Sequence, residues 1–320
     1  MNTTFTSVFA QDMKNFLELQ KSLNFNPESY RPRLKQFDDF LSQRSFQLQS
    51  LSKKVIFEWI ERKEGETNNG RRARLFALNK FLKYLCELGR CECIIPKGCF
   101  DKAIPFSPYL FSDYEISRFF SACDSFPVSI EDTESTIVMP VVFRMIYCCA
   151  LRPGEAFRLK RDEVDLTEGI LQIKQSKHHK DRIVWMSRDL LELCRSYDKL
   201  SNNNRIWFFS SSNGGPFPQS WLTNRFKKCI SLAEIGNGIS NPRIYDFRHS
   251  ACSRVVLQWI EEGEDVNNLV CYLREHMGHS SFSHTLYYLH ILPDNLLSSV
   301  GIDWESIDDL YPSLTEEVKR

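Results

Sequence analysis

Two arginines, a histidine and a tyrosine lie in three short motifs in the second half of the chain. The motifs are Ala150-Leu-Arg-Pro-Gly-Glu155, Tyr245-Asp-Phe-Arg248 and Met277-Gly-His-Ser-Ser-Phe-Ser-His-Thr-Leu-Tyr-Tyr288. A guanidinium is planar, always charged and able to hold two phosphate oxygens at once. A tyrosine hydroxyl can attack phosphorus and hold the product covalently. Together these residue types predict cutting of a phosphodiester without a metal ligand set or a nucleotide-binding loop.

In their order and separation, the three motifs resemble those of the tyrosine recombinase family, the phage-type integrases, and the resemblance spans most of the chain. Arg152 and Arg248 match the two arginine motifs of the family, and Glu155 follows the first arginine at the family's spacing. His279 follows Met-Gly as the family's histidine follows Leu-Gly, and Tyr288 lies nine residues further on. The resemblance implies that both arginines hold the scissile phosphate and offset charge in the transition state. Glu155 is expected to support the site rather than to react.

Two adjacent tyrosines compete for the role of nucleophile. Neighbouring residues of a helix point about 100° apart, so only one can face the phosphate. The spacing from His279 selects Tyr288, and Tyr287 is expected to pack. A free tyrosine titrates near pH ~10. The arginines and His279 could stabilise its phenolate as it forms.

Lys177 lies in the polar segment Gln175-Ser-Lys-His-His-Lys180. Members of the resembled family place a lysine there that donates a proton to the departing 5′ oxygen. A mobile ammonium on a turn can act as such a general acid. Lys174 and Lys180 remain alternatives, because the turn can be drawn differently.

Tyr245 is the departure from the family pattern, since most integrases have histidine at this position. Telomere resolvases, which are relatives of the family, also have tyrosine there. Tyrosine keeps a hydrogen-bond donor near the phosphate but cannot take up a proton at neutral pH as imidazole does. Its spacing of three residues from Arg248 is compatible with a shared helical face. The alternative is that Tyr245 only packs.

Helical periodicity dominates the first 90 residues. A polar break at 62–70 separates helices, and Gly89 is expected to end one. The apolar positions that carry this pattern are Phe16, Leu17, Leu19, Leu34, Phe37, Phe40, Leu41, Leu75, Leu78, Leu82 and Leu85. Ser112-Asp-Tyr-Glu115 then predicts a capping box at the start of a new helix.

The second half is expected to be helical apart from one β-hairpin. An apolar helix over 141–150 would place Arg152 just beyond its end, and 170–175 and 182–186 are β-prone runs around a polar turn. We therefore predict a mainly α protein. It would have a helical core DNA-binding domain at 1–95, a linker at 96–111, and a catalytic domain with a small antiparallel sheet at 112–320. Its tail, from about 292, has enough apolar residues to dock on a neighbouring subunit.

The composition is consistent with an intracellular DNA-binding protein. The net charge is +0, but basic residues are concentrated in 31–102 and the final stretch is acidic. The first residues have neither a basic start nor an apolar run, so no signal peptide is expected, and no run of about 18 apolar residues predicts a membrane span. The 11 cysteines are expected to be reduced thiols of a cytoplasmic protein.

No metal or cofactor is predicted. Cys91, Cys93 and Cys99 do not have the spacing of standard zinc knuckles. The histidines at 276, 279, 284 and 290 form neither His-Glu-x-x-His nor its inverse.

The resemblance implies a site-specific DNA recombinase, or integrase, of the kind found on mobile elements. It would bind double-stranded recombination sites as a homotetramer, or as a dimer on each site. Accessory DNA-bending proteins are possible further partners. Strands would be exchanged through a 3′-phosphotyrosine and a Holliday junction. The alternatives are a type IB topoisomerase, a catalytically silent DNA-binding relative, suggested by Tyr245, and, more distantly, a metal hydrolase.

Overall fold

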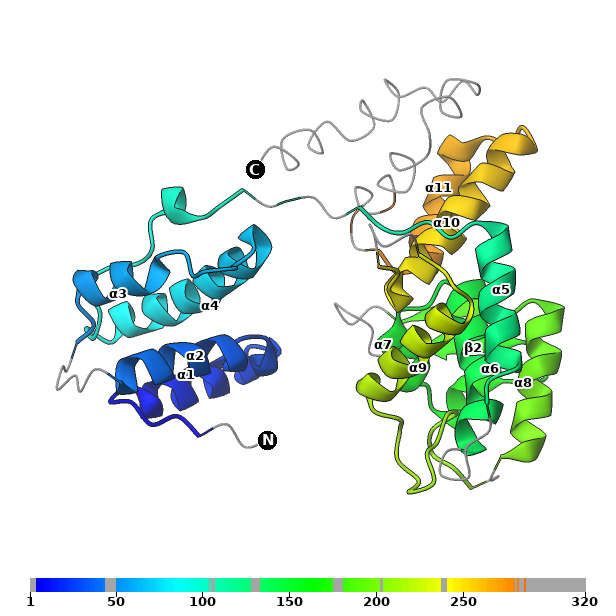
Figure 1. Ribbon diagram of the computed structural model, residues 1–320, viewed down its shortest axis with the longest axis horizontal. Helices are drawn as coiled ribbons and strands as arrows, with labels where there is room; N and C mark the ends of the chain where they lie inside the picture. The colour runs from blue at the N-terminus through cyan, green and yellow to red at the C-terminus, as the bar shows by residue number, and fades with distance from the viewer. Residues whose placement is uncertain are drawn as a thin grey trace. The chain divides into compact units, whose positions relative to one another are not determined.

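The chain forms two compact units, residues 1–106 and 107–320, which we describe separately. The computed structural model describes residues 4–43, 50–102, 104, 107–127, 133–174, 181–201, 204–236, 241–279, 281 and 285. Helices dominate both units (Figure 1), which confirms the predicted mainly α fold. None of the helices in these ranges combines the length and apolarity needed to cross a lipid bilayer.

The first unit is a helical bundle around one aromatic core. Its α-helices are α1 (Ala10–Ser22), α2 (Arg31–Ser42), α3 (Lys53–Ile60) and α4 (Asn68–Glu87), with 3-10 turns at Pro27–Ser29 and Lys97–Cys99. Phe16 of α1, Phe37 of α2 and Phe81 of α4 are fully buried in this core. The helices that the amphipathic patterns predict in the first 90 residues are therefore confirmed.

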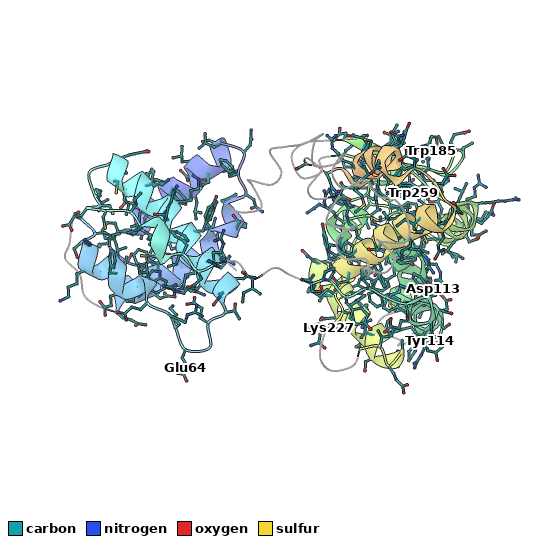
Figure 2. The ribbon with its side chains drawn as sticks, turned by 90° about the horizontal axis from the view of Figure 1, so that it is seen from above. Glu64, Asp113, Tyr114, Trp185, Lys227 and Trp259 are labelled. Carbon is teal, nitrogen blue, oxygen red and sulfur yellow. The ribbon has the colours of Figure 1, made fainter. Side chains whose placement is uncertain are left out.

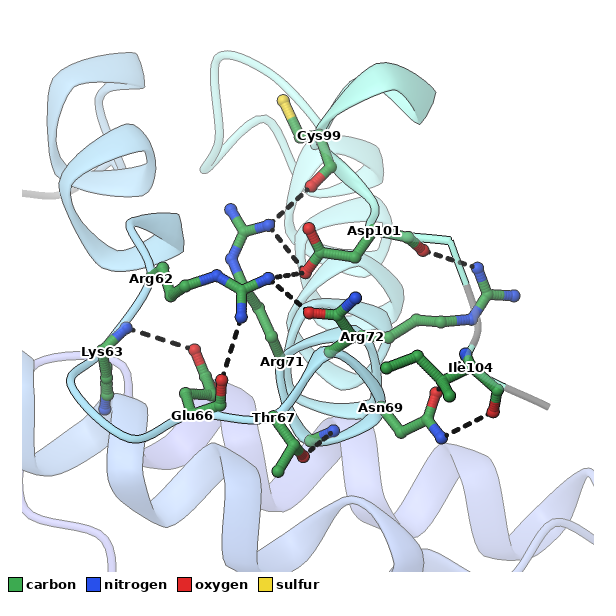
Figure 3. A network of polar contacts seen from close by, with 12 residues as sticks. Arg62, Lys63, Glu66, Thr67, Asn69, Arg71, Arg72, Cys99, Asp101 and Ile104 are labelled. Atoms are coloured by element: carbon green, nitrogen blue, oxygen red, sulfur yellow. Dashed lines mark hydrogen bonds and ion pairs between the residues drawn. The ribbon is translucent and has the colours of Figure 1, made fainter. Parts of the chain in front are cut away.

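Polar contacts hold the segment after α4 against the start of that helix (Figure 3). The Asp101 carboxylate lies 3.0 Å from Nη1 of Arg71 and 3.1 Å from Nη2 of Arg62. Asn69 exchanges two hydrogen bonds of 3.1 Å with the backbone of Ile104. Part of the predicted linker, 96–111, thus packs with the first unit, whose limit lies at residue 106.

The second unit surrounds its own core with helices and a small sheet. Its α-helices are α5 (Asp113–Asp124), α6 (Thr133–Cys148), α7 (Pro153–Phe157), α8 (Arg188–Leu200), α9 (Gln219–Leu232), α10 (Ile244–Glu261) and α11 (Val266–Met277). Phe119, Phe143, Phe226 and Phe247, from four of these helices, make edge-on or tilted ring contacts in the core. The capping box predicted at the start of α5 is confirmed, since Ser112 and Glu115 bind each other's backbone amides.

The predicted hairpin is present within a three-stranded antiparallel sheet. Its strands are β1 (Val164–Asp165), β2 (Ile170–Ile173) and β3 (Arg182–Trp185) in that spatial order, with a 3-10 turn at Arg161–Glu163 before β1. In the pairing of β2 with β3, Ile170 lies opposite Trp185 and Ile173 opposite Arg182. Arg182 is thereby fixed at the end of the hairpin next to its turn, of which residues 175–180 lie outside the described ranges.

The helix before the first arginine motif differs from its predicted extent of 141–150. It begins at Thr133 and ends at Cys148, and Ala150 adopts the left-handed conformation with φ +47°. The amide of Leu151 returns to the carbonyl oxygen of Ile146 at 3.0 Å, as in helices closed by a left-handed residue. This reversal of the chain brings Arg152 to the start of α7.

Candidate functional site

Arg248 lies at the centre of the candidate site. It occupies the second turn of α10, with 0% of its surface exposed, because the preceding Phe247 anchors this part of the helix in the core. Its guanidinium donates hydrogen bonds to the carbonyl oxygens of Ala150 and Met277. Its Nη2 also lies 3.3 Å from Nε2 of His279. One side chain therefore contacts the segments that carry the other two motifs.

Arg152 approaches the same place from the N-cap position of α7. Its Nη1 donates to Glu155 at 2.7 Å, and its Nη2 donates to the carbonyl oxygen of Gly278 at 3.0 Å. The side chain retains 18% exposure. A guanidinium has five N–H donors, and these two contacts use two of them. Arg152 thus combines a fixed orientation with donors that can serve an anion.

A second guanidinium shares the Glu155 carboxylate with Arg152. Arg182, at the start of β3, donates from Nη1 and Nη2 to the two oxygens of Glu155 at 3.0 and 2.8 Å. Its Nε donates to the carbonyl oxygen of His276 at 2.8 Å. We call Arg152, Glu155 and Arg182 the Glu155 network. It ties α7, the sheet and the end of α11 together.

The Glu155 network keeps its carboxyl group ionised. Burial alone raises the pKa of Glu155, but hydrogen bonds and charge from Arg182, together with contacts from Arg152, outweigh it and lower the pKa to about 2. The carboxylate accordingly orients the two cations at neutral pH. The expectation that Glu155 supports the site rather than reacts stays a prediction.

Gly278 lets α11 end close to the Glu155 network. It has φ +60°, and the amide of His279 returns to the carbonyl oxygen of Arg274 at 3.1 Å. A Cβ atom at Gly278 would lie 3.2 Å from Cδ and Nη1 of Arg182. Both the conformation and the close approach favour glycine, and the turn directs His279 towards Arg248.

The histidines in this turn are held by hydrogen bonds. Nδ1 of His279 lies 2.9 Å from Oγ1 of Thr285, and both residues are buried. Nε2 of His276 lies 3.1 Å from the carbonyl oxygen of Cys149. Burial lowers the pKa of His276. A neutral His276 joins the end of α11 to the segment that precedes Arg152.

Tyr245 and Arg152 both line a pocket of about 660 Å³. Tyr245 is 37% exposed, and its ring centroid lies 5.2 Å from that of His249. The pocket also has two carboxylates, Glu155 and Glu163, and Lys227 of α9 is exposed at the surface (Figure 2). The basic residues lining it are Arg152, Arg158, Lys160, Lys174, Lys227 and Arg243. The pocket wall beside Arg152 is thus suited to an anion.

Two predicted site residues, Lys177 and Tyr288, lie outside the described residues, as does the alternative nucleophile Tyr287. Of the alternatives for the general acid, Lys174 lines the pocket and Lys180 lies outside the described ranges. No cluster of three or more metal-ligating side chains occurs in the described ranges. The predicted absence of a metal stays a prediction.

Three contributors to the site were not predicted from the sequence: Arg182, His276 and Thr285. Arg182 and His276 contact residues that are distant in sequence, and Thr285 contacts His279 only because of the turn that follows α11. An arginine beginning an otherwise apolar strand is a usable signal for Arg182, because burial of its charge requires a partner. The sequence contains no comparable signal for Thr285.

The pattern of the phage integrase family matches residues 111–294, which is more than half of the chain. The chain belongs to the phage integrase family. Among curated members, the tyrosine recombinase XerD of Pseudomonas aeruginosa is 23% identical, with 86% of this chain and 90% of XerD covered. XerD of Rhizobium meliloti is 23% identical, with 84% and 86% covered.

Solved structures of integrases and recombinases share the fold of this phage integrase family member. XerH bound to its difH substrate, in a pre-cleavage complex, aligns with a TM-score of 0.64 at 16% identity and covers 87% of this chain and 81% of XerH. A lambda integrase dimer bound to a COC′ core site aligns with a TM-score of 0.64 at 12% identity, with 87% and 94% covered. The predicted family, fold class and enzyme class are confirmed.

Proposed function

We propose that this chain cuts and rejoins DNA at specific sites through a covalent 3′-phosphotyrosine. The observation that carries the proposal is the convergence of Arg152, Arg248 and His279, from three separate motifs, in one hydrogen-bonded network. A hydrolase could use a similar cluster, but the position of Tyr288 in the third motif favours a covalent intermediate. Membership of the phage integrase family supports the same chemistry.

In the proposed first step, the scissile phosphate binds beside Arg152 and Arg248. The Tyr288 oxygen forms a bond to phosphorus, and the bond from phosphorus to the 5′ oxygen breaks. Lys177 is the proposed source of the proton that the departing 5′ oxygen takes up. The guanidiniums stabilise the negative charge that accumulates on the non-bridging oxygens, where one oriented donor is typically worth about 10²–10³ in rate.

In the proposed second step, a 5′ hydroxyl from another strand attacks the phosphotyrosine. Its O–H proton returns to Lys177, the bond from phosphorus to the Tyr288 oxygen breaks, and Tyr288 is released. One phosphodiester replaces another, so the exchange needs no ATP, and we propose no metal or cofactor for it. Recombination proceeds through a Holliday junction on a homotetramer, or a dimer at each site, with accessory DNA-bending proteins where the site requires them. We propose that the reaction takes place in the cytoplasm and that the protein belongs to a mobile genetic element.

The decisive experiment traps the covalent intermediate. Purified protein is incubated with nicked suicide substrates that tile the DNA flanking its gene, and a denaturant-resistant protein–DNA adduct is measured. We expect an adduct that disappears in Tyr288→Phe and persists in the matched control Tyr287→Phe. An adduct that survives Tyr288→Phe would contradict the assignment of the nucleophile.

A catalytically silent DNA-binding relative is the second candidate, because Tyr245 stands where most integrases have a histidine. Tight binding to one DNA site without an adduct would support this candidate over a recombinase. Tyr245→His then tests the cause. Recovery of the adduct in this variant would assign the loss of cleavage to the tyrosine.

A further inference from the structure

The hydrogen bonds of His279 determine which of its ring nitrogens carries the proton. Nδ1 lies 2.9 Å from Oγ1 of Thr285, and Nε2 lies 3.3 Å from Nη2 of Arg248. The imidazole is 9% exposed and Thr285 is 0% exposed, so water competes little for either contact. Both nitrogens therefore have fixed protein partners.

Arg248 allows one assignment of the neutral ring. A guanidinium carries only donors, so Nε2 of His279 must accept, and its lone pair faces Arg248. The proton of the neutral imidazole is then on Nδ1. The Thr285 hydroxyl can accept that proton in a hydrogen bond, because a hydroxyl is both a donor and an acceptor.

We propose that Thr285 is a positioning residue: its hydroxyl accepts from Nδ1–H of His279 and so holds the ring in the tautomer that Arg248 sets, with the Nε2 lone pair directed towards the phosphate site. The proposal deepens the function proposed above and rests on it. With the opposite tautomer, Nε2 would carry a hydrogen directed at the guanidinium of Arg248, and the hydroxyl of Thr285 would have to donate to Nδ1. The observed contact with Arg248 disfavours that arrangement.

The tautomer gives His279 a definite role in cleavage. When DNA is bound, the guanidinium of Arg248 serves the phosphate, and Nε2 is the basic atom beside the reacting group. As the Tyr288 oxygen attacks phosphorus, its O–H bond breaks and the proton forms a bond to Nε2. The resulting imidazolium keeps its Nδ1–H bond to Thr285, and it returns the proton to Tyr288 when the phosphotyrosine is resolved.

The position of Thr285 in the chain suits this task. It lies six residues after His279 and three residues before Tyr288, so one short segment connects the proposed nucleophile to the group that orients its base. The hydroxyl is needed in this arrangement, whereas the methyl group of threonine only fills space. Serine keeps the hydroxyl, and valine keeps the shape of threonine without it.

Nitrogen-15 NMR of the full-length protein with labelled histidine reads the tautomer in the absence of DNA. His279→Asn identifies the signals of His279. We expect the Nδ1–H tautomer in the wild type, in Thr285→Ser and, because Arg248 remains, in Thr285→Val. In Thr285→Val the Nδ1–H loses its Thr285 acceptor, so its proton should exchange faster with water and the unfolding temperature should fall by the loss of one buried hydrogen bond. An Nε2–H tautomer in the wild type, or an Nδ1–H proton in Thr285→Val that exchanges as slowly as in the wild type, would overturn the proposal.

Single-turnover cleavage of a suicide substrate then measures the consequence. We expect Thr285→Val to cleave about tenfold more slowly with unchanged DNA affinity, which is the loss expected for one neutral hydrogen bond. Thr285→Ser should stay within about twofold of the wild type. Equal losses in both variants would reject the role of the hydroxyl. A wild type that forms no adduct would reject the proposed function and leave the tautomer result standing, so the two failures are distinguishable.

Discussion

At the scale of single residues, replacing either motif arginine affects both the stability of the fold and the rate of cleavage, but the two effects are easier to separate for Arg152 than for Arg248. Arg248 is fully buried and donates to two carbonyl oxygens, whereas Arg152 keeps contact with solvent. Removal of Arg248 leaves buried acceptors without their donor, at a cost of about 1–3 kcal/mol each. Water can replace part of what Arg152 provides, so Arg152 is the better probe of catalysis.

We expect Arg248→Met to lower the free energy of unfolding by about 2–5 kcal/mol. Arg152→Lys should change it by less than about 1 kcal/mol, yet slow cleavage by about 10²–10³-fold, because lysine lacks the planar fork. Chemical denaturation and single-turnover cleavage measure the two effects. A stable Arg248→Met variant, or normal cleavage by Arg152→Lys, would contradict this division of roles.

His249 makes stability depend on pH. Burial lowers its pKa to about 4 from the ordinary histidine value of 6.5, against the opposing charge of Asp246. The unfolded chain therefore binds this proton first as pH falls, so stability is complete above pH 6.5 and declines towards pH 4 by up to about 3 kcal/mol. His249→Gln should lose less stability over that interval in urea denaturation at pH 7.5, 5.5 and 4.5. Parallel curves for both proteins would show that His249 is not responsible.

Sequence reasoning reached the residues whose chemistry is visible in their type. Arg152, Arg248 and His279 were predicted as site residues, and the structure brings them together; their catalytic roles stay predictions. Arg182 and Thr285 were missed because their roles arise from contacts that the fold creates. The Arg182–Glu155 pair joins a strand to a helix start, and local spacing contains no information about it.

At the scale of elements, the site depends on how helices end. Both α6 and α11 are followed by a left-handed residue, Ala150 or Gly278, and each turn is followed closely by a motif residue. The capping box at the start of α5 and the β2–β3 hairpin were predictable, because the sequence signals for both lie within a few neighbouring residues. The two-residue β1 and the end of α6 at Cys148 were not, since they depend on tertiary packing.

Gly278→Ala separates close packing from backbone strain. It places a methyl group 3.2 Å from Arg182, whereas the control Gly263→Ala, at φ +72° after α10, meets nothing within 4 Å. We expect the control to cost about 1 kcal/mol from strain alone and Gly278→Ala to cost about 2–3 kcal/mol. Only Gly278→Ala should slow cleavage, because it displaces Arg182 and His279. Equal effects in denaturation and cleavage would show that the contact with Arg182 is unimportant.

At the scale of the whole molecule, a neutral chain contains two units of opposite charge. Residues 1–106 have 18 Lys and Arg against 12 Asp and Glu, a net charge of +6, so the total of +0 requires −6 in the rest. The basic unit is suited to the proposed contact with DNA phosphates. Total charge alone would argue against DNA binding, and the distribution along the chain removes that objection.

The limit of the first unit is testable by truncation. Residues 1–106 include Asp101, which pairs with Arg62 and Arg71, and Ile104, which pairs with Asn69 (Figure 3). Residues 1–95, the domain predicted from the sequence, lack these partners. We expect the 1–106 fragment to unfold about 5–10 °C above the 1–95 fragment, because 1–2 kcal/mol shifts a domain of this size by roughly that much.

Asp101→Asn in the 1–106 fragment isolates the ion pairs from the rest of the segment. It removes the charge that Arg62 and Arg71 share and leaves the Asn69–Ile104 hydrogen bonds in place. Its unfolding temperature should therefore fall between those of the two fragments. Equal temperatures for 1–95 and 1–106 in a thermal melt would instead mean that 96–106 behaves as part of the linker predicted at 96–111.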